Sequence, residues 1–272
     1  MESKMGSEIN TGRSSKGNHH ALVCGASMGI GEAAAFALAK RGIALTILAR
    51  TAKALEALVP LLKEAGAPAV HVLSADLDDL SATETLVRGH VEEHGPIDIL
   101  VNNSGGPPFG PILDAGGRDF LEAFSRHVLA SHLMVQICLP GMMAEGLGRI
   151  VNVVSSSVYE PIPGLGVSNT VRAAMAGWSK SVSRELPPGV TINNVLPGFT
   201  DTERLAELKS ALARQRGVGE EVIEREWLAQ IPEGRLARPE ELGEFIAFLA
   251  SPAAAYIRGQ SIAIDGGKMH SI

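Results

Sequence analysis

The sequence has few cysteines and no clustered basic residues, and each shortage argues against a class of protein. Only two cysteines, Cys24 and Cys138, occur among 272 residues, and both have apolar neighbours. Two buried thiols in a reducing compartment are therefore favoured over a disulfide, and a cytoplasmic location is expected. The net charge is −6 with no long basic run. A nucleic-acid surface is not expected, because phosphate binding needs clustered Lys and Arg.

Long apolar runs are also missing. No stretch of about 18 apolar residues is found, so no membrane span is expected. Residues 1–17, MESKMGSEINTGRSSKG, lack the apolar core of a signal peptide and predict a flexible polar tail. His19 and His20 are adjacent, but no second pair at metal-ligand spacing accompanies them. We interpret them as the start of a strand and predict no metal site.

From Ala21 onward, short apolar runs alternate with helical patterns. Near-continuous apolar runs predict strands at 21–25, 43–49, 69–75, 97–102, 148–154, 190–196 and 260–265. Helical patterns lie at 31–41, 52–65, 80–94, 120–145, 168–186 and 240–249. Such runs are typical of parallel strands with helices on both sheet faces. Residues 18–272 are therefore predicted to form a single α/β domain, doubly wound and Rossmann-type, with a seven-stranded parallel sheet.

One segment, residues 200–236, interrupts this alternation. It places one or two amphipathic helices between two predicted strands. They begin just past the carboxyl end of a strand, where open α/β sheets bind ligands. We therefore predict a mobile helical lid over the site.

A glycine-rich turn follows the first predicted strand, in ALVCGASMGIGEAAAFALAKRG. Gly25, Gly29 and Gly31 permit a tight turn, close approach of backbone amides to a pyrophosphate, and close helix packing. The second predicted strand ends at Ala49, where enzymes that prefer NAD usually carry an acidic residue. Arg50 follows instead, and a guanidinium suits a 2′-phosphate. NADP(H) is thus favoured over NAD(H), with an exposed arginine at a helix start as the alternative.

Five motifs stand in order: CGASMGIG, SADLDD, VNNSGG, NNVLPGFTDT and GQSIAIDGG. Over about residues 18–267 they make the sequence resemble the short-chain dehydrogenase/reductase family. NNSGGPPFGP and EPIPGLGVSNTVRA resemble a 3-oxoacyl-(acyl-carrier-protein) reductase-like branch with an atypical active site. In the family, these motifs contact adenine, ribose and the nicotinamide carboxamide. The resemblance implies cofactor contacts from Gly25, Ser27, Gly29, Ile30, Gly31, Arg50, Asp76, Leu77, Asn103, Ser104, Gly105, Arg172, Pro197, Gly198 and Thr202.

The catalytic residues of this family are normally Asn, Ser, Tyr and Lys. By the resemblance, Ser155 occupies the serine position, while His127, Ser168 and Arg172 stand where Asn, Tyr and Lys are expected. No Tyr-x-x-x-Lys occurs anywhere in the chain. The resemblance therefore implies a catalytic set of Ser155, Ser168, Arg172 and His127 without the usual proton donor.

The chemistry of the replacements differs from that of the family. An aliphatic hydroxyl such as Ser168 is a far weaker acid than a phenol. Arg172 keeps its proton, so it suits ribose binding or oxyanion stabilisation rather than proton relay. His127 is either an acid or a packed helix residue. Tyr159 is assigned, with Ser155, to the substrate pocket, as an inward phenol or as an aromatic wall.

Three functions follow from these residues. The first is an NADP(H)-linked reductase or dehydrogenase acting on a carbonyl, an alcohol or a 3-oxoacyl thioester. The second is a dinucleotide-binding sensor or partner subunit without redox turnover, and the third is a non-redox lyase. A homodimer or homotetramer is also expected, because the predicted helices at 120–145 and 168–186 carry apolar residues beyond the need of one sheet face, namely Val171, Met175, Trp178, Val182 and Leu186.

Overall fold

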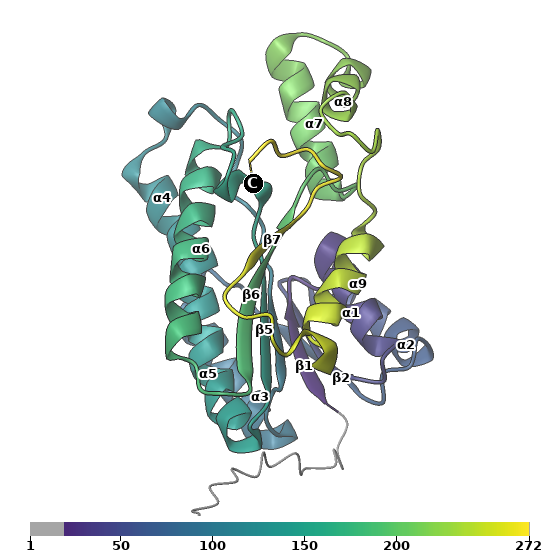
Figure 1. The fold of residues 1–272 in the computed structure, drawn as a ribbon, viewed down its shortest axis with the longest axis vertical. Helices are drawn as coiled ribbons and strands as arrows, with labels where there is room; N and C mark the ends of the chain where they lie inside the picture. The colour runs from purple at the N-terminus through teal and green to yellow at the C-terminus, as the bar shows by residue number, and fades with distance from the viewer. Residues whose placement is uncertain (1–18, 272) are drawn as a thin grey trace, which may run out of the picture.

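A seven-stranded, fully parallel sheet forms the centre of the protein (Figure 1). The computed structural model describes residues 19–271, and the predicted tail at 1–17 lies outside them. The strand order is β3-β2-β1-β4-β5-β6-β7, which confirms the predicted doubly wound α/β fold. The strands are β1 (His20–Cys24), β2 (Ala44–Ala49), β3 (Val70–Ser74), β4 (Ile99–Asn102), β5 (Gly148–Val153), β6 (Val190–Pro197) and β7 (Ser261–Ile264).

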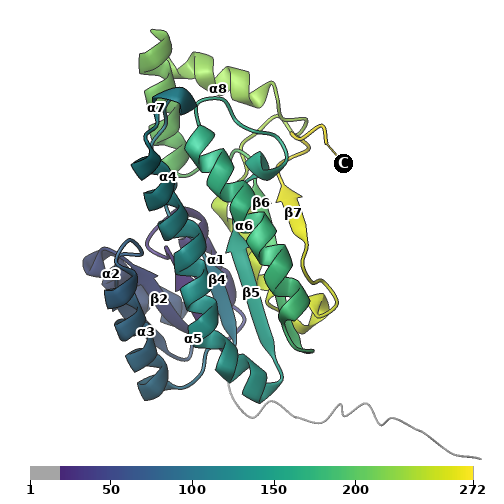
Figure 2. The same ribbon diagram turned by 90° about the vertical axis from the view of Figure 1, so that its left-hand side faces the viewer.

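Helices cover both faces of this sheet (Figures 1 and 2). One face carries α1 (Gly29–Ala39), α2 (Ala52–Glu64) and α9 (Pro239–Leu249). The other carries α3 (Leu80–His94), α4 (Gly117–Phe124), α5 (Ala130–Glu145) and α6 (Gly166–Glu185). A hydrophobic core lies on each face of the sheet, and alternate strand residues contribute to each core, since successive side chains point to opposite faces. Val23 packs with α1 and α9, whereas Leu22 and Cys24 pack with α5.

The two cysteines are buried and unbonded, as predicted. Burial raises the pKa of the Cys24 thiol to about 12 and raises that of Cys138 further. Both thiols are therefore protonated and unreactive at neutral pH.

Most predicted element bounds agree with the structure to within two residues, but the predicted helix 120–145 does not. It begins at Gly117 and contains a π-helical turn, Ser125–Leu129, between α4 and α5. This run, Gly117–Glu145, is long and apolar enough by length and composition to cross a membrane, contrary to the expectation that no such segment exists. Half of the 18-residue apolar window is buried within the fold.

The apolar residues of α6 face the protein's own core. Val171 and Met175 are buried with α4, and Leu186 is buried with α5. Trp178 and Val182 pack against the same cores. The core of one chain therefore accounts for the apolar face of α6, and the expected homodimer or homotetramer stays a prediction.

The segment predicted as a lid forms two helices, α7 (Glu203–Arg216) and α8 (Glu220–Leu228), at the carboxyl end of the sheet. They enclose a small apolar core of their own, formed by Phe199, Ala213, Ile223, Trp227 and Ile231. A parallel bridge between Thr200 and Ala237 joins the two ends of the segment. The helical prediction is confirmed, and the mobility of the lid stays a prediction.

Candidate active site

The glycine-rich turn between β1 and α1 is held against the end of β4. Gly25 and Gly29 have φ of 61° and 58°, a conformation that side chains disfavour. A Cβ on Gly31 would lie 2.0 Å from the carbonyl oxygen of Gly25, so only glycine fits there. Asn103 Nδ2 donates a hydrogen bond to that same oxygen at 3.2 Å. The turn is therefore fixed by residues from two strands.

The start of α1 suits a phosphate group. Met28 caps the helix without any side-chain hydrogen bond, so the first backbone N–H groups stay available to a ligand. Ser27 is half-buried in the turn, and Ile30 packs against the core beneath it. A Cβ on Gly29 would meet Thr202 Cγ2 at 3.2 Å, so the lid helix α7 begins beside the turn. These residues fit a dinucleotide pyrophosphate.

Arg50 lies exposed directly after β2 and forms no ion pair with any residue between 19 and 271. Its backbone oxygen accepts a hydrogen bond from Ser74 Oγ at 3.0 Å, which joins the ends of β2 and β3. Asp76 follows β3 and is also exposed, with its carboxylate accepting from Asp78 N at 3.1 Å. The guanidinium of Arg50 is thus available to bind an anionic ligand at this edge of the sheet.

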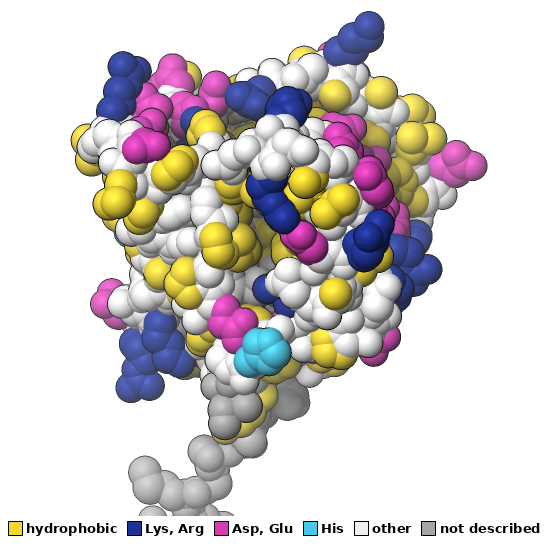
Figure 3. Space-filling model, turned by 90° about the horizontal axis from the view of Figure 1, so that it is seen from above, with side chains coloured by type: hydrophobic (Ala, Val, Ile, Leu, Met, Phe, Trp, Pro, Cys, Tyr) yellow, Lys and Arg dark blue, Asp and Glu magenta, His cyan; other side chains and the backbone are white. Residues whose placement is uncertain are grey.

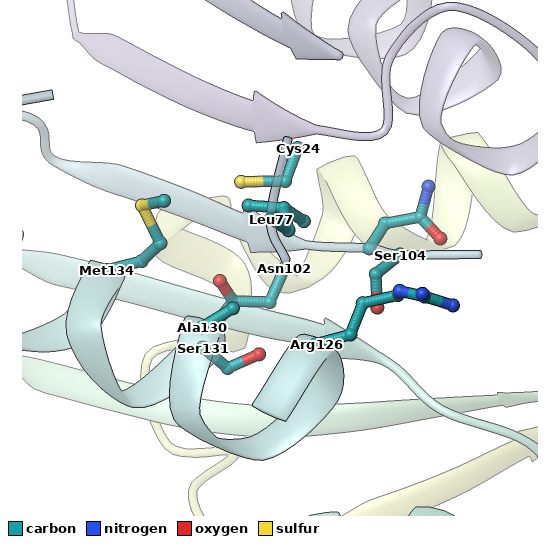
Figure 4. A pocket seen from close by; sticks show the side chains of 9 residues that line it. Cys24, Leu77, Asn102, Ser104, Arg126, Ala130, Ser131 and Met134 are labelled. Carbon is teal, nitrogen blue, oxygen red and sulfur yellow. The ribbon is translucent and has the colours of Figure 1, made fainter. Parts of the chain in front are cut away.

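A small pocket opens beside the end of β4 (Figure 4). Leu77 and Cys24 lie on one side of it, and Ser104 and Arg126 lie near its other end. Arg126 is held by two hydrogen bonds to the Asp78 carboxylate, at 2.7 and 2.6 Å. The structure therefore brings Leu77, Asn103 and Ser104 together around one pocket, as the resemblance implies.

His127 lies in the π-helical turn and is only 2% exposed. Its Nδ1 is 2.6 Å from Ser104 Oγ, while its buried Nε2 has no hydrogen-bond partner among residues 19–271. Burial, followed by the nearby Arg172 and Arg126 charges, lowers the pKa of His127 to about 2. The ring is neutral at physiological pH. It can donate one N–H, but it does not act there as an imidazolium acid.

Ser168 and Arg172 lie one turn apart on α6, facing Gly106 in the loop after β4. A Cβ placed on Gly106 would be 4.0 Å from Ser168 Oγ and 3.9 Å from Arg172 Nη2. Arg172 Nη1 donates to the carbonyl oxygen of Val153 at 2.9 Å. Burial and the charge of Arg204 lower the pKa of Arg172 to about 10, so the guanidinium stays protonated at neutral pH.

The remaining predicted site residues lie around the same end of the sheet. Ser155 follows β5, and its Oγ accepts from Ser157 N at 3.1 Å. Pro197 ends β6, and Gly198 N donates to Ile264 O at 3.0 Å. Thr202 caps α7 through a bond from Leu205 N, and Gly105 is exposed in the loop after β4.

Neither tyrosine is buried in the site. Tyr159 is 51% exposed and Tyr256 is fully exposed. The inward-pointing phenol considered for Tyr159 is not observed, although its place after the 3-10 helix Ser156–Val158 leaves it at the site's edge. Across residues 19–271, no group of three or more His, Cys, Asp or Glu side chains is placed to hold a metal ion.

Arg204 is a site residue that the sequence reasoning missed. It lies in the first turn of α7, and its Nη2 donates to Pro107 O at 2.6 Å, in the loop after β4. The same nitrogen would be 3.7 Å from a Cβ on Gly106. The only signal in the sequence is its position two residues after Thr202, at the start of the predicted lid.

Known proteins match this chain over most of its length. A family model described as enoyl-(acyl carrier protein) reductase matches residues 25–269. A putative ketoacyl reductase of Streptomyces coelicolor is 31% identical over 250 residues, covering 91% of this chain and 95% of the relative. The 3-oxoacyl-(acyl-carrier-protein) reductase FabG of Vibrio cholerae is 33% identical over 250 residues, covering 91% and 96%.

A solved structure also shares the fold. YwfH, described as an NADPH-dependent reductase involved in bacilysin biosynthesis, superimposes with a TM-score of 0.88 at 30% identity. The match covers 94% of this chain and all of that one. The chain therefore belongs to the short-chain dehydrogenase/reductase family of oxidoreductases, and is of its 3-oxoacyl-(acyl-carrier-protein) reductase-like type.

Proposed function

We propose that this protein is an NADP(H)-dependent reductase of a small carbonyl compound, with ketones and 3-oxoacyl thioesters as the substrate class. The observation that carries the proposal is the turn at Gly25–Gly31, where a side chain on Gly31 would meet the Gly25 carbonyl oxygen at 2.0 Å. A turn without side chains at these positions lets backbone N–H groups come close to a pyrophosphate. Arg50, which forms no ion pair within residues 19–271, supports NADP(H), as does the description of YwfH as NADPH dependent.

The side chains at the site supply polar support for a carbonyl oxygen. When bound, the reduced nicotinamide would supply the hydride, and the alkoxide formed at the carbonyl oxygen would take its proton from solvent water, because both tyrosines are exposed. Ser155 and Ser168 offer hydroxyl donors to the carbonyl oxygen, and Arg172 offers a fixed positive charge to the oxyanion that develops there. Val153 O holds that guanidinium in place, so little reorganisation is needed. A neutral His127, bonded to Ser104, offers one N–H donor beneath the site.

Turnover is tested by following NADPH absorbance with a panel of ketones and 3-oxoacyl thioesters. We expect oxidation with at least one compound. We expect Arg172→Gln to lower kcat by roughly a hundredfold, the usual effect of removing one oxyanion donor. Ser181→Ala, on the exposed side of the same helix, serves as the control and keeps wild-type kcat. Tight NADPH binding without turnover on the whole panel would sink the proposal.

The second candidate is a dinucleotide-binding protein without redox turnover. It is favoured by one observation, the exposure of both tyrosines, which leaves no phenol in the site. The double variant Ser168→Tyr, Arg172→Lys separates the two candidates. If the wild type is inactive and the double variant is active, the sensor or partner subunit is supported. If the wild type is active and the double variant is not, the reductase is supported.

We also propose a cytoplasmic homo-oligomer. The buried free thiols support the location. Exposed apolar side chains along α4 and α5 support the association, and they include Leu121, Phe124, Leu129 and Met143. Light scattering tests the homo-oligomer, because a monomer at micromolar concentration would contradict it.

A further inference from the structure

Three hydrogen-bond donors from two distant helices meet at Gly106. A Cβ on this residue would lie 3.7 Å from Arg204 Nη2, 3.9 Å from Arg172 Nη2 and 4.0 Å from Ser168 Oγ. Because residue 106 is glycine, no side chain occupies the space that these donors flank. Seen from above, this end of the molecule is hollowed, and basic side chains lie beside the hollow (Figure 3).

The two guanidinium groups are held by backbone oxygens rather than by carboxylates. Arg172 is fixed by Val153 O, at the end of β5, and Arg204 by Pro107 O. Within residues 19–271, no carboxylate forms an ion pair with Arg172, and Arg204 pairs only with Glu207, at 3.3 Å on the exposed side of α7. The positive charge of the pair is therefore not balanced at Gly106.

Two nearby positive charges repel each other, and an anion placed between them offsets this repulsion. The Nη2 atoms of both arginines lie within 4 Å of the same point beside Gly106, and the charge of Arg204 accordingly adds to the effect of burial in lowering the pKa of Arg172. A guanidinium offers a planar fork of N–H groups that matches a carboxylate. Ser168 adds a neutral donor on the same side.

We propose that Arg204, with Arg172 and Ser168, binds a carboxylate of the substrate beside the reacting carbonyl, so that the preferred substrates are short oxo acids. This inference rests on the proposed reductase function. In a short oxo acid the carbonyl and the carboxylate are one or two bonds apart, so Arg172 can serve both groups. Of the groups of the substrate, Arg204 contacts only the carboxylate, and it joins the anionic substrate to the first turn of α7.

Acetoacetate and its neutral amide, acetoacetamide, test the proposal. Wild-type enzyme should have the higher kcat/KM for the acid. In Arg204→Gln, the acid-to-amide ratio of kcat/KM should fall by about tenfold or more, since the carboxylate loses a charged partner. Arg204→Lys keeps the charge and should restore part of the ratio. Arg214→Gln removes the same charge from the exposed, far end of α7 and should leave the ratio unchanged.

A binding measurement separates this inference from the proposed function. Malonate, which cannot be reduced, is titrated into the NADPH complex by calorimetry. We expect wild type and Arg214→Gln to bind malonate with similar affinity. In Arg204→Gln the affinity for malonate should fall by about tenfold or more. Malonate binding without ketone turnover would end the reductase proposal and keep the anion site.

Two results would overturn the anion site. One is equal malonate affinity, or an equal acid-to-amide ratio, in wild type and Arg204→Gln. The other is weaker NADPH binding in Arg204→Gln with malonate affinity retained. That result would assign the arginine to a cofactor phosphate. A uniform loss of kcat on both substrates, without change in their ratio, would reduce Arg204 to an anchor between α7 and Pro107.

Discussion

At the scale of single residues, the position of one backbone oxygen explains why residue 31 is glycine. A methyl group there would lie 2.0 Å from Gly25 O. We therefore predict that Gly31→Ala displaces the turn, lowers stability by about 1–3 kcal/mol and weakens NADPH binding by at least about tenfold. Denaturant unfolding and fluorescence titration measure the two effects.

Gly177→Ala is the matched control for that substitution. Gly177 is exposed in the middle of α6, and a Cβ there would meet nothing within 4 Å. Alanine should stabilise this helix by about 0.5–1 kcal/mol, because it restricts the unfolded chain. Equal effects of the two substitutions would contradict the steric explanation of Gly31.

Arg50 carries the cofactor preference at the same scale. It is exposed after β2 and unpaired among residues 19–271, so its charge is free for a 2′-phosphate. Arg50→Gln should lower the ratio of NADPH to NADH affinity by roughly tenfold. Lys53→Gln removes an equal charge from the first turn of α2 and should leave the ratio as it is. An unchanged ratio in Arg50→Gln would mark Arg50 as a surface residue only.

At the scale of elements, four histidines join β1, β3 and α3 at the edge of the sheet far from the site. Thr46 Oγ1 bridges His20 Nε2 and His90 Nε2 at 2.7 and 2.6 Å. The rings of His71 and His94 are 4.1 Å apart, and those of His90 and His94 are 4.6 Å apart. These residues come from segments about 20 to 70 positions apart, so the sequence does not reveal the cluster.

The cluster predicts a loss of stability in mild acid. Burial and the neighbouring rings lower the pKa of His90 to about 4, and those of His20 and His71 are lowered by burial first. Asp98 and Glu93 oppose this effect, while Lys63 adds to it. The unfolded chain takes up protons below about pH 6.5, whereas folded His90 does so only near pH 4. Stability is therefore full above pH 6.5 and decreases between pH 6.5 and 4.

Urea unfolding at a series of pH values measures this effect. We expect a decrease of about 2 kcal/mol across that range from His90, and a flatter profile for His90→Gln, whose amide can still bond to Thr46. His132→Gln, on α5 outside the cluster, should keep the wild-type profile. Identical profiles for wild type and His90→Gln would show that the cluster does not titrate as described.

At the scale of the whole molecule, the lid packs mainly on itself at the carboxyl end of the sheet. Its helices α7 and α8 share a small core of five buried residues, and they reach the β4 loop through Arg204 and Pro107. Amides of α7 and α8 should therefore exchange with deuterium faster than those of β4 and β5, and NADPH should slow them. Equal exchange in the lid and the central strands would mean that the lid is rigid.

Much of this molecule could be predicted from apolar runs and glycines, because they act locally. The seven strands and most helix bounds agree with the structure to within two residues. The π-helical turn at His127 was not predicted, since nothing in the spacing of apolar residues distinguishes it from an α-helix. Val171 and Met175 pack in the core of their own chain, so the expected homodimer or homotetramer stays a prediction. The spacing of apolar residues shows a buried face without showing what buries it.

The fold class and the glycine-rich turn follow from the sequence, since alternating apolar runs and closely spaced glycines dictate backbone conformation over short distances. The charge of the site instead depends on tertiary contacts. Arg204 meets Arg172 and Ser168 at Gly106 because α7 returns over the end of β4, a contact between segments far apart in the chain. The burial that makes His127 neutral likewise depends on packing around the π-helical turn.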